Sequence, residues 1–289
     1  MTRVDVEEYR RMAAVEDEMW FYHALHAHLE RELVAACGGE ESTNARTGEH
    51  GRDAHATWHG CPARGFEGIG EKTGCAPDGE RRVARKILDA GCGTGGLIRR
   101  LMPLHPDWTW TGIDLEPLAC ELACARCAAE IFQGSVTALP FADGAFDAVV
   151  SADVLYHLDD DRAALREYCR VLKPGGMVVI NVPAHRWLWS YHDVTVHARR
   201  RYARAEIAMK LREAGFDVMR CTHWNTLPLP MILLRRKLLP PPRSGSDVQL
   251  YPRPVEALLR TAMAVERTWL RLFGTLPLGS SILATARKR

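Results

Sequence analysis

Residues 87–96 read Ile-Leu-Asp-Ala-Gly-Cys-Gly-Thr-Gly-Gly, and this stretch decides the fold class. The apolar and small residues of Lys86–Ala90 predict a short buried strand. The glycines after it allow a tight turn in which the backbone approaches a ligand closely. A helix is predicted from the end of the turn to about Leu104. Its first turn offers unpaired N–H groups and a partial positive charge, so the sequence predicts a site for an anionic group here.

Strands and helices alternate downstream of this unit. Further strands are predicted at Trp108–Ile113, Glu130–Gln133, Phe146–Ser151, Met177–Val182, Phe216–Thr222 and Ser281–Ala286, and helices at Pro117–Ala129, Arg162–Leu172 and Ala205–Ala214. Such alternation predicts an α/β fold with helices on both faces of the sheet. Crossover connections are right-handed, so a doubly wound, mostly parallel sheet is expected.

The rest of the chain divides into an N-terminal part and an insertion. Residues 1–36 have apolar positions at helical spacing and an aromatic cluster, Trp20 to Tyr22, which favours a helical lid over a ligand site. Residues 37–82 lack periodicity and predict a flexible insertion. Residues 83–289 form the expected α/β domain, with 228–278, including a helix near Val255–Phe273, inserted between the last two strands.

Composition narrows the function classes. The 289 residues carry a net charge of +2, which gives no argument for nucleic acid binding. The polar N-terminus and nine scattered cysteines indicate free thiols in a reducing cytoplasm. The longest apolar run, Leu227–Leu234, is much shorter than the roughly 20 residues of a membrane-spanning helix.

No metal site is expected. The histidines and cysteines of residues 37–82 do not follow a zinc-finger spacing. Cys120, Cys124 and Cys127 have the spacing of an iron–sulfur motif, but they fall inside a predicted helix, where one face of small residues lines the core.

The glycine turn alone does not identify its ligand. Gly91, Gly93 and Gly96 fit a dinucleotide fingerprint, whereas Gly91, Gly93 and Gly95 fit that of a methyltransferase. Asp114 lies 18 residues after Gly96, at the end of the next strand, where a carboxylate accepts hydrogen bonds from ribose hydroxyls. A helix N-cap is the structural alternative for Asp114. Turn and carboxylate together indicate an adenosine-type ligand.

Four ordered segments carry a specific resemblance. They are Asp-Ala-Gly-Cys-Gly-Thr-Gly at 89–95, Ala-Leu-Pro-Phe-Ala-Asp-Gly-Ala-Phe-Asp-Ala-Val-Val at 138–150, Ala-Asp-Val-Leu-Tyr-His-Leu at 152–158 and Arg-Val-Leu-Lys-Pro-Gly-Gly at 170–176. Together they resemble the class I S-adenosylmethionine-dependent methyltransferases, in particular the small-molecule type 11/12-like subgroup. The resemblance implies a Rossmann-like, seven-stranded sheet with an antiparallel last strand, S-adenosylmethionine as cofactor and a small-molecule acceptor.

The resemblance also implies cofactor-binding residues. The methionine portion would lie against Asp89, Gly91, Cys92 and Gly93. The ribose would bind Asp114, and the adenine would lie between Leu115, Ser135 and Val136. Asp153, just after the fourth strand, would face both cofactor and acceptor.

The methyl group of a sulfonium is already activated, so the protein must position the acceptor and, where needed, remove a proton. His157 and the pair His192 and Asp193, a base with its orienting acid, are the catalytic candidates. Substrate-binding candidates are Tyr156, Trp187, Trp189, His197, Arg200, Arg201 and Tyr202. The structural alternative for His157 is a packing role. For the candidates after the fifth strand, the alternative is a loop held in place by salt bridges. A metal at His192, Asp193 and His197 is not expected.

The arginines favour an anionic acceptor. Leu227–Leu234 followed by Arg235, Arg236 and Lys237 suits a lipid surface, so a lipid-linked acceptor and a peripheral membrane contact are further expectations. An insertion that covers the pocket is the alternative. An NAD(P)-dependent oxidoreductase, or a cofactor-binding protein of this fold without methyl transfer, are the competing functions. The oligomeric state is left open.

Overall fold

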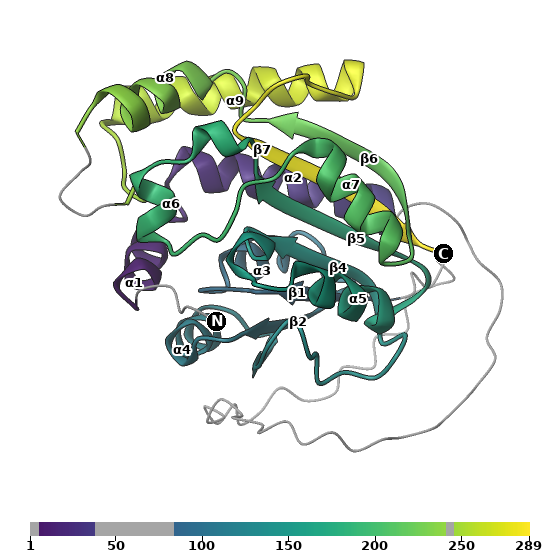
Figure 1. The fold of residues 1–289 in the computed structure, drawn as a ribbon. Helices are drawn as coiled ribbons and strands as arrows, with labels where there is room; N and C mark the ends of the chain where they lie inside the picture. Colours follow the sequence, from purple (N-terminus) through teal and green to yellow (C-terminus); the bar gives the residue numbers. More distant parts are fainter. Residues whose placement is uncertain (1–5, 38–83, 241–245) are drawn as a thin grey trace, which may run out of the picture.

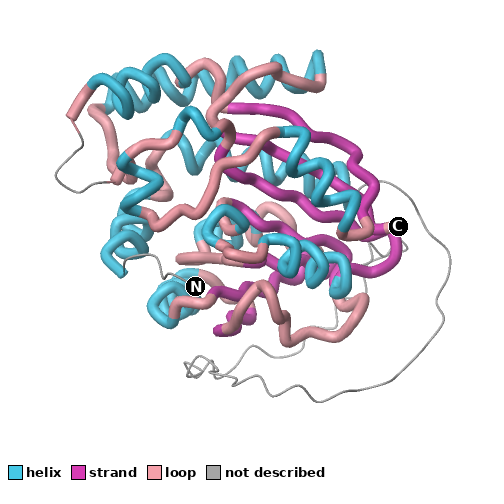
Figure 2. Tube along the Cα trace, in the orientation of Figure 1, coloured by secondary structure: helices cyan, strands magenta, loops and turns pink. Residues whose placement is uncertain are grey.

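The computed structural model describes residues 6–37, 84–240 and 246–289, so the predicted flexible insertion lies almost entirely outside the described residues. Seven strands form one sheet in the order β3-β2-β1-β4-β5-β7-β6, and β7 runs antiparallel to both of its neighbours. Figures 1 and 2 show this sheet between two layers of helices. The strands are β1 Arg85–Ala90, β2 Trp108–Asp114, β3 Glu130–Gln133, β4 Phe146–Ala152, β5 Leu172–Pro183, β6 Phe216–Trp224 and β7 Ser281–Lys288. The predicted doubly wound sheet is confirmed.

Alternation of side chains along the central strands divides the core into two layers. Leu88 faces one layer, with the apolar side chains of α5 (Asp161–Val171) and α7 (Arg204–Glu213). Ile87 faces the other, with those of α2 (Trp20–Cys37), α3 (Gly96–Leu101) and α9 (Arg253–Phe273). α4 (Pro117–Arg126) contributes the buried Ala123 to this second layer. Because both faces are covered, the central strands are apolar throughout.

Shorter elements lie at the carboxyl edge of the parallel strands. They are α1 Val6–Val15, η1 Leu155–His157, η2 Arg186–Leu188, α6 Tyr191–Thr195, α8 Leu229–Leu233 and η3 Leu234–Leu238. The N-terminal helices agree with the prediction. α6, α8 and η3 were not predicted, because runs of five residues are too short to display a helical period.

Several predicted boundaries are wrong. α3 ends at Leu101, three residues early, and α4 ends at Arg126, where Cys127 turns to an extended backbone. The fifth strand begins at Leu172 rather than Met177. Leu172 pairs with Phe146 and Met177 with Ala148, so the four residues between them loop out of the register. Gly175, with a φ of 75°, permits this local irregularity.

Cys92, Cys120, Cys127, Cys169 and Cys221 are free thiols, whereas Cys124 is disulfide-bonded. The expectation of free thiols is therefore wrong at Cys124, because pairing depends on tertiary proximity rather than spacing. Within the described part of the chain, no group of three His, Cys, Asp or Glu side chains is arranged to hold a metal ion. None of the described helices combines the length and apolar character needed to cross a membrane.

Candidate functional site

The turn after β1 takes its shape from glycines in the left-handed backbone region. Gly91, Gly93 and Gly95 have φ angles of 91°, 53° and 77°. A Cβ at Gly91 would collide with the side chain of Val154, so a larger residue does not fit there. A Cβ at Gly93 would meet only the Met12 methyl, at 3.8 Å. The backbone of the turn is thus open on the side that faces the cavity.

Asp114 closes the end of β2 beside this turn. One carboxylate oxygen accepts the N–H of Gly93 at 2.9 Å and the other accepts the N–H of Glu116 at 3.0 Å. Burial raises the pKa of Asp114, although these backbone hydrogen bonds lower it. The N-cap of α4 is Glu116, which makes no side-chain cap, so Asp114 is not the helix cap. Its carboxylate is held rigidly against the glycine turn.

A cavity of about 310 Å³ opens above the carboxyl edge of the sheet. Its floor contains the predicted cofactor residues Asp89, Gly91, Cys92, Gly93, Asp114, Leu115, Val136 and Asp153. Ser135, beside Val136, instead directs its hydroxyl to Thr137, 2.8 Å away. One wall comes from the N-terminal helices, with Tyr9, Met12, Phe21, Tyr22 and Leu25. The placement of these helices supports the lid interpretation.

Carboxyl groups gather around the glycine turn. Asp89 is buried, and burial followed by the charges of Asp114 and Glu16 raises its pKa to about 7. Glu16, between α1 and α2, accepts a hydrogen bond from the Thr94 hydroxyl at 2.7 Å and pairs with Arg126. Clustered carboxyls of one sign favour a cationic ligand group, which would return Asp89 to its ionised form.

Asp153 lies at the end of β4, where a chain of hydrogen bonds fixes its side chain. Its backbone is left-handed, with φ 55°. The Trp224 indole N–H donates to Asn181 Oδ1 at 2.7 Å, and Asn181 Nδ2 donates to Asp153 Oδ1 at 2.9 Å. An indole nitrogen can only donate, so it fixes which end of the Asn181 amide faces Asp153. Burial raises the pKa of Asp153 to about 7, although the Asn181 bond and the Arg201 charge lower it.

The two histidine candidates line the cavity in different environments. The His157 ring lies against that of Tyr156, also a lining residue, with centroids 3.9 Å apart and planes tilted by 36°. Its Nδ1 is buried without a partner among the described residues. His192 Nδ1 accepts the backbone N–H of Asp247 at 3.3 Å. Burial lowers the pKa of each imidazole to about 4, so both are neutral near pH 7.

Asp193 does not orient His192. Its carboxylate accepts the Ser190 N–H at 2.9 Å and forms two hydrogen bonds with Arg201, at 2.7 and 3.0 Å. Arg201 also donates to the Ala184 carbonyl at 3.1 Å. Both charged side chains are buried, although parts of them border the cavity. This bidentate pair holds the loop after β5 in place.

The remaining substrate candidates lie away from the cavity lining. Arg200 donates to the carbonyls of Leu158 and Asp159, and the hydroxyl of the buried Tyr202 donates to Asp161 at 2.7 Å. Trp187, Trp189 and His197 are exposed. Arg200 and Tyr202 attach the loop to the region around α5, which is what the structural alternative anticipated for this segment.

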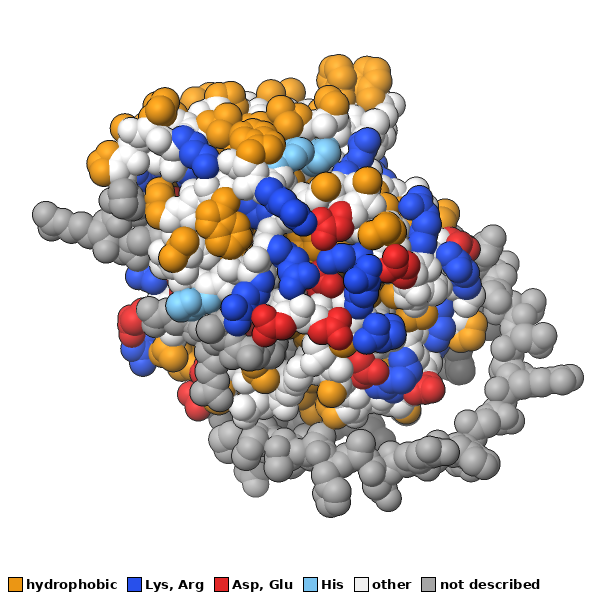
Figure 3. Space-filling view, in the orientation of Figure 1, with side chains coloured by type: hydrophobic (Ala, Val, Ile, Leu, Met, Phe, Trp, Pro, Cys, Tyr) orange, Lys and Arg blue, Asp and Glu red, His pale blue; other side chains and the backbone are white. Residues whose placement is uncertain are grey.

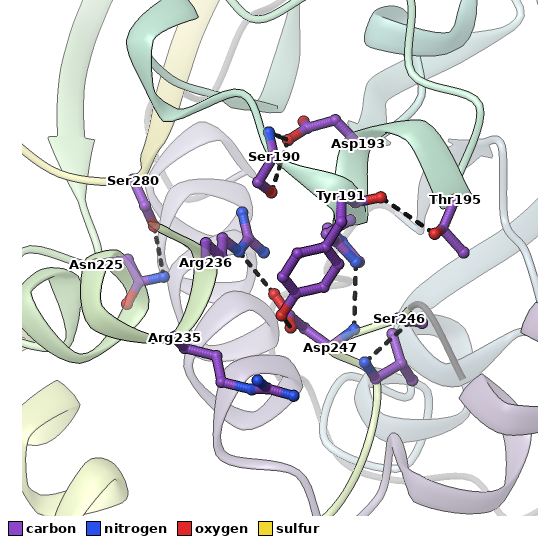
Figure 4. A network of polar contacts seen from close by, with 12 residues as sticks. Ser190, Tyr191, Asp193, Thr195, Asn225, Arg235, Arg236, Ser246, Asp247 and Ser280 are labelled. Carbon is purple, nitrogen blue, oxygen red and sulfur yellow. Dashed lines mark hydrogen bonds and ion pairs between the residues drawn. The ribbon is translucent and has the colours of Figure 1, made fainter. Parts of the chain in front are cut away.

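The insertion after β6 supplies a further wall, as the alternative of an insertion that covers the pocket anticipated, although none of its residues was named as a site candidate. Arg235, Arg236 and Tyr251 line the cavity, with Met231 and Ile232 beside them. Figure 4 shows how this wall meets the loop after β5. Asp247 accepts the Tyr191 hydroxyl and Arg236 Nε, each at 2.6 Å. Burial raises the pKa of Asp247, but the positive charge of Arg236 and the hydrogen bonds from Tyr191 and Arg236 outweigh burial, so the pKa lies below its usual value.

Arg235 lies over the Tyr191 ring, with its guanidinium carbon 5.9 Å from the ring centroid, and donates to the Pro240 carbonyl. No carboxylate within the described residues pairs with it. A lining arginine of this kind, beside apolar side chains, can receive an anionic group. The only sequence signal was the basic run of residues 235–237, far from the other site motifs.

Comparison with known proteins gives a family match for the central region. Residues 88–180 match the family described as "Methyltransferase domain". The chain is 32% identical over 154 residues to the O-methyltransferase resE of Aspergillus sclerotiorum, covering 48% of this chain and 58% of that protein. It is 34% identical over 143 residues to the uncharacterized protein YafE of Escherichia coli, covering 46% of this chain and 68% of that protein.

Among solved structures, geranyl diphosphate C-methyltransferase from Streptomyces coelicolor aligns with 72% of this chain and 70% of its own, at 16% identity and a TM-score of 0.49. The match spans only 40% to 58% of the length of three curated relatives, which include ajmaline N-methyltransferase of Rauvolfia serpentina. The family match, residues 88–180, covers the glycine turn and the strands from β2 to most of β5.

Proposed function

This chain belongs to the class I S-adenosylmethionine-dependent methyltransferases, and we propose that it transfers a methyl group from that cofactor to an anionic, partly apolar small molecule. The observation that carries the proposal is one cavity in which the glycine turn and Asp114 adjoin a wall of apolar side chains and Arg235. Family membership decides against the oxidoreductase interpretation of the turn.

The residues present fit the cofactor. The Asp114 carboxylate is held by the N–H of Gly93 in the turn on one oxygen and by the N–H of Glu116 on the other, and it would receive the ribose hydroxyls. The open face of Gly93 would accommodate the methionine portion, and the raised pKa of Asp89, about 7, indicates a carboxyl that lacks a cationic partner. When bound, S-adenosylmethionine supplies a methyl group on a positively charged sulfur.

For proton removal, we propose His157 as the base and His192 as a hydrogen-bond donor to the acceptor. His157 lines the cavity and is neutral near pH 7, which is the form that can accept a proton, although burial makes its imidazole a weaker base than usual. His192 already accepts a backbone N–H at Nδ1, so the neutral ring carries its proton on Nε2. Asp193 and Arg201 would act as positioning residues that hold this loop.

On the acceptor side, we propose that Arg235 binds the anionic group and that Tyr22, Ile232 and Tyr251 contact the apolar body. Methyl-transfer assays should compare matched carboxylate or phosphate acceptors with their neutral analogues. Turnover of the anionic members, reduced in Arg235→Gln but retained in Arg289→Gln at the C-terminus, would support this assignment. Equal turnover of neutral acceptors would contradict it.

The cofactor site is tested by calorimetry with S-adenosylhomocysteine. Asp114→Ala should weaken binding by about tenfold or more, roughly 1.4 kcal/mol, because both carboxylate oxygens are lost. Asp217→Ala is the matched control, since that exposed carboxylate pairs with Arg289 on the outer edge of the sheet. Equal affinity in Asp114→Ala would contradict the site, and tight binding without any methylated product would favour the non-transferring alternative.

The cytoplasmic location inferred from the sequence is retained as part of this proposal, on the basis of the five free thiols among the described residues, against the disulfide at Cys124. Cell fractionation with an antibody to the intact protein tests it.

A further inference from the structure

The outer face of α9 carries an unusual row of exposed apolar side chains. Leu258, Val265, Trp269 and Leu272 are exposed, and their spacing of seven, four and three residues places them on one face of the helix. The neighbouring face holds Leu259, Met263 and Leu270 against the core. α9 therefore presents two apolar faces, of which only one is covered by the described part of the protein.

A second exposed apolar group lies on η3. Leu234, Leu238 and Leu239 are exposed, and Lys237 Nζ donates to the Trp189 carbonyl at 2.7 Å. This contact places the exposed Trp189 beside η3. Figure 3 shows hydrophobic side chains gathered along the edge of the molecule where α8 and α9 lie in Figure 1. We call Leu234, Leu238 and the following Leu239, together with the exposed row of α9, the apolar rim.

Charge on this insertion is distributed unevenly. Residues 227–278 contain only three acids, Asp247, Glu256 and Glu266, against eight lysines and arginines. The Glu256 carboxylate accepts the backbone N–H groups of Trp20 and Tyr251, at 2.9 and 3.0 Å. Glu266 accepts three backbone N–H groups at the end of β6, and Asp247 pairs with Arg236. All three carboxylates are thus turned inward, which leaves basic and apolar side chains on the outer surface.

The rim also adjoins the cavity. Met231 and Ile232 of α8, and Arg235 and Arg236 of η3, line the cavity, whereas Leu234 and Leu238 of the same segment point outward. One short segment is therefore the shared wall between the proposed acceptor pocket and the exposed surface. An acceptor held at that surface would have a short path into the cavity.

We propose that the apolar rim docks on an anionic lipid bilayer, from which an amphipathic anionic acceptor enters the cavity past α8 and η3. Exposed Leu and Trp side chains would enter the interface, and lysines and arginines would contact the anionic headgroups. A symmetric dimer through the same rim would bring two basic surfaces together, which charge repulsion opposes. Acceptor entry rests on the proposed function, whereas docking itself does not.

Co-sedimentation of the intact protein with vesicles tests the docking. We expect binding to vesicles of phosphatidylcholine with phosphatidylglycerol, little binding to phosphatidylcholine alone, and weaker binding as salt is raised. The double variant Leu238→Glu with Leu272→Glu should reduce the bound fraction at least about tenfold, since each leucine inserts apolar area that a carboxylate does not. These side chains are 76% and 72% exposed, so folding should be unaffected.

Leu104→Glu is the matched control, because this leucine is 58% exposed and lies after α3, outside the rim. Equal loss of binding in this control, or no vesicle binding by the wild type, would overturn the proposal. Self-association of the wild type in light scattering, abolished by the double variant, would also overturn it and assign the rim to a second copy. The assay needs neither cofactor nor acceptor, so failure of docking and failure of S-adenosylhomocysteine binding are separate results.

Discussion

At the scale of single residues, the site combines buried carboxyls with raised pKa values and fixed hydrogen-bond partners. Asp89 and Asp153 each have a pKa of about 7 because burial penalises their charged forms. Asp153 is nevertheless held by Asn181, whose amide is oriented by Trp224. The Asn181 hydrogen bond therefore holds the Asp153 carboxyl in place in either protonation state. A bound cation can then shift the carboxyl to its ionised form.

A pH dependence of cofactor binding follows. A positively charged ligand favours the ionised carboxyls, so binding below pH 7 must release protons that the free protein holds. We expect affinity to increase as pH rises through about 7 and then to level off, more for S-adenosylmethionine than for S-adenosylhomocysteine, which lacks the sulfonium charge. The affinity for the cofactor cannot change by more than about tenfold per pH unit for each proton that binding releases.

Calorimetry in two buffers of different ionisation enthalpy measures the protons released. Asp153→Asn preserves an acceptor for Asn181 and removes one titration, so it should flatten the profile. A flat wild-type profile, or one that falls with rising pH, would show that neither carboxyl responds to the cofactor.

At the scale of elements, the N-terminal helices are attached to the cofactor turn through one acidic residue. Glu16 bonds Thr94 of the turn and pairs with Arg126 of α4, and it is buried. A Cβ at Gly96 would lie only 2.5 Å from the Glu16 carboxylate, so this approach depends on glycine. The link between α1 and α2 is thus held directly over the turn.

Glu16→Gln should therefore loosen the N-terminal wall of the cavity. The substitution removes the ion pair with Arg126, which keeps only its 3.3 Å pair with the half-exposed Asp17. The cost is therefore less than the several kcal/mol of breaking a fully buried pair. We expect faster release of S-adenosylhomocysteine, by about threefold to thirtyfold, measured by stopped-flow fluorescence. Glu7→Gln is the control, since Glu7 forms an exposed pair with Arg10 on the surface of α1. An unchanged release rate would mean that α1 and α2 do not limit exit from the cavity.

At the scale of the whole molecule, one cavity joins three distant parts of the chain. Its lining comes from α1 and α2, from the turns after β1, β2 and β4 with the loop after β5, and from the insertion that contains α8 and η3. A ligand that fills such a cavity stabilises all three parts together, because each part contributes contacts to the bound ligand.

Binding of S-adenosylhomocysteine should therefore protect residues of α1 and α8, more than two hundred positions apart, from hydrogen exchange. At a concentration about one hundredfold above the dissociation constant, the folded protein should gain roughly 2.7 kcal/mol. Hydrogen-exchange mass spectrometry measures both segments, with α7 on the opposite face of the sheet as the internal reference. Protection confined to the glycine turn would show that the walls do not respond to the ligand.

The local sequence determined the order of strands and helices, the glycine turn and the position of Asp114, because periodicity, glycine conformation and strand ends are properties of neighbouring residues. Tertiary structure decided which side chains meet across the chain. Trp224 finds Asn181 from 43 positions away, and Asp247 reaches Tyr191 from 56. Asp193 pairs with Arg201 rather than with His192, because a guanidinium can give a buried carboxylate two hydrogen bonds together with a positive charge. The local spacing of apolar residues does not predict these long-range contacts. They depend on how the elements pack and on which charged groups become buried together.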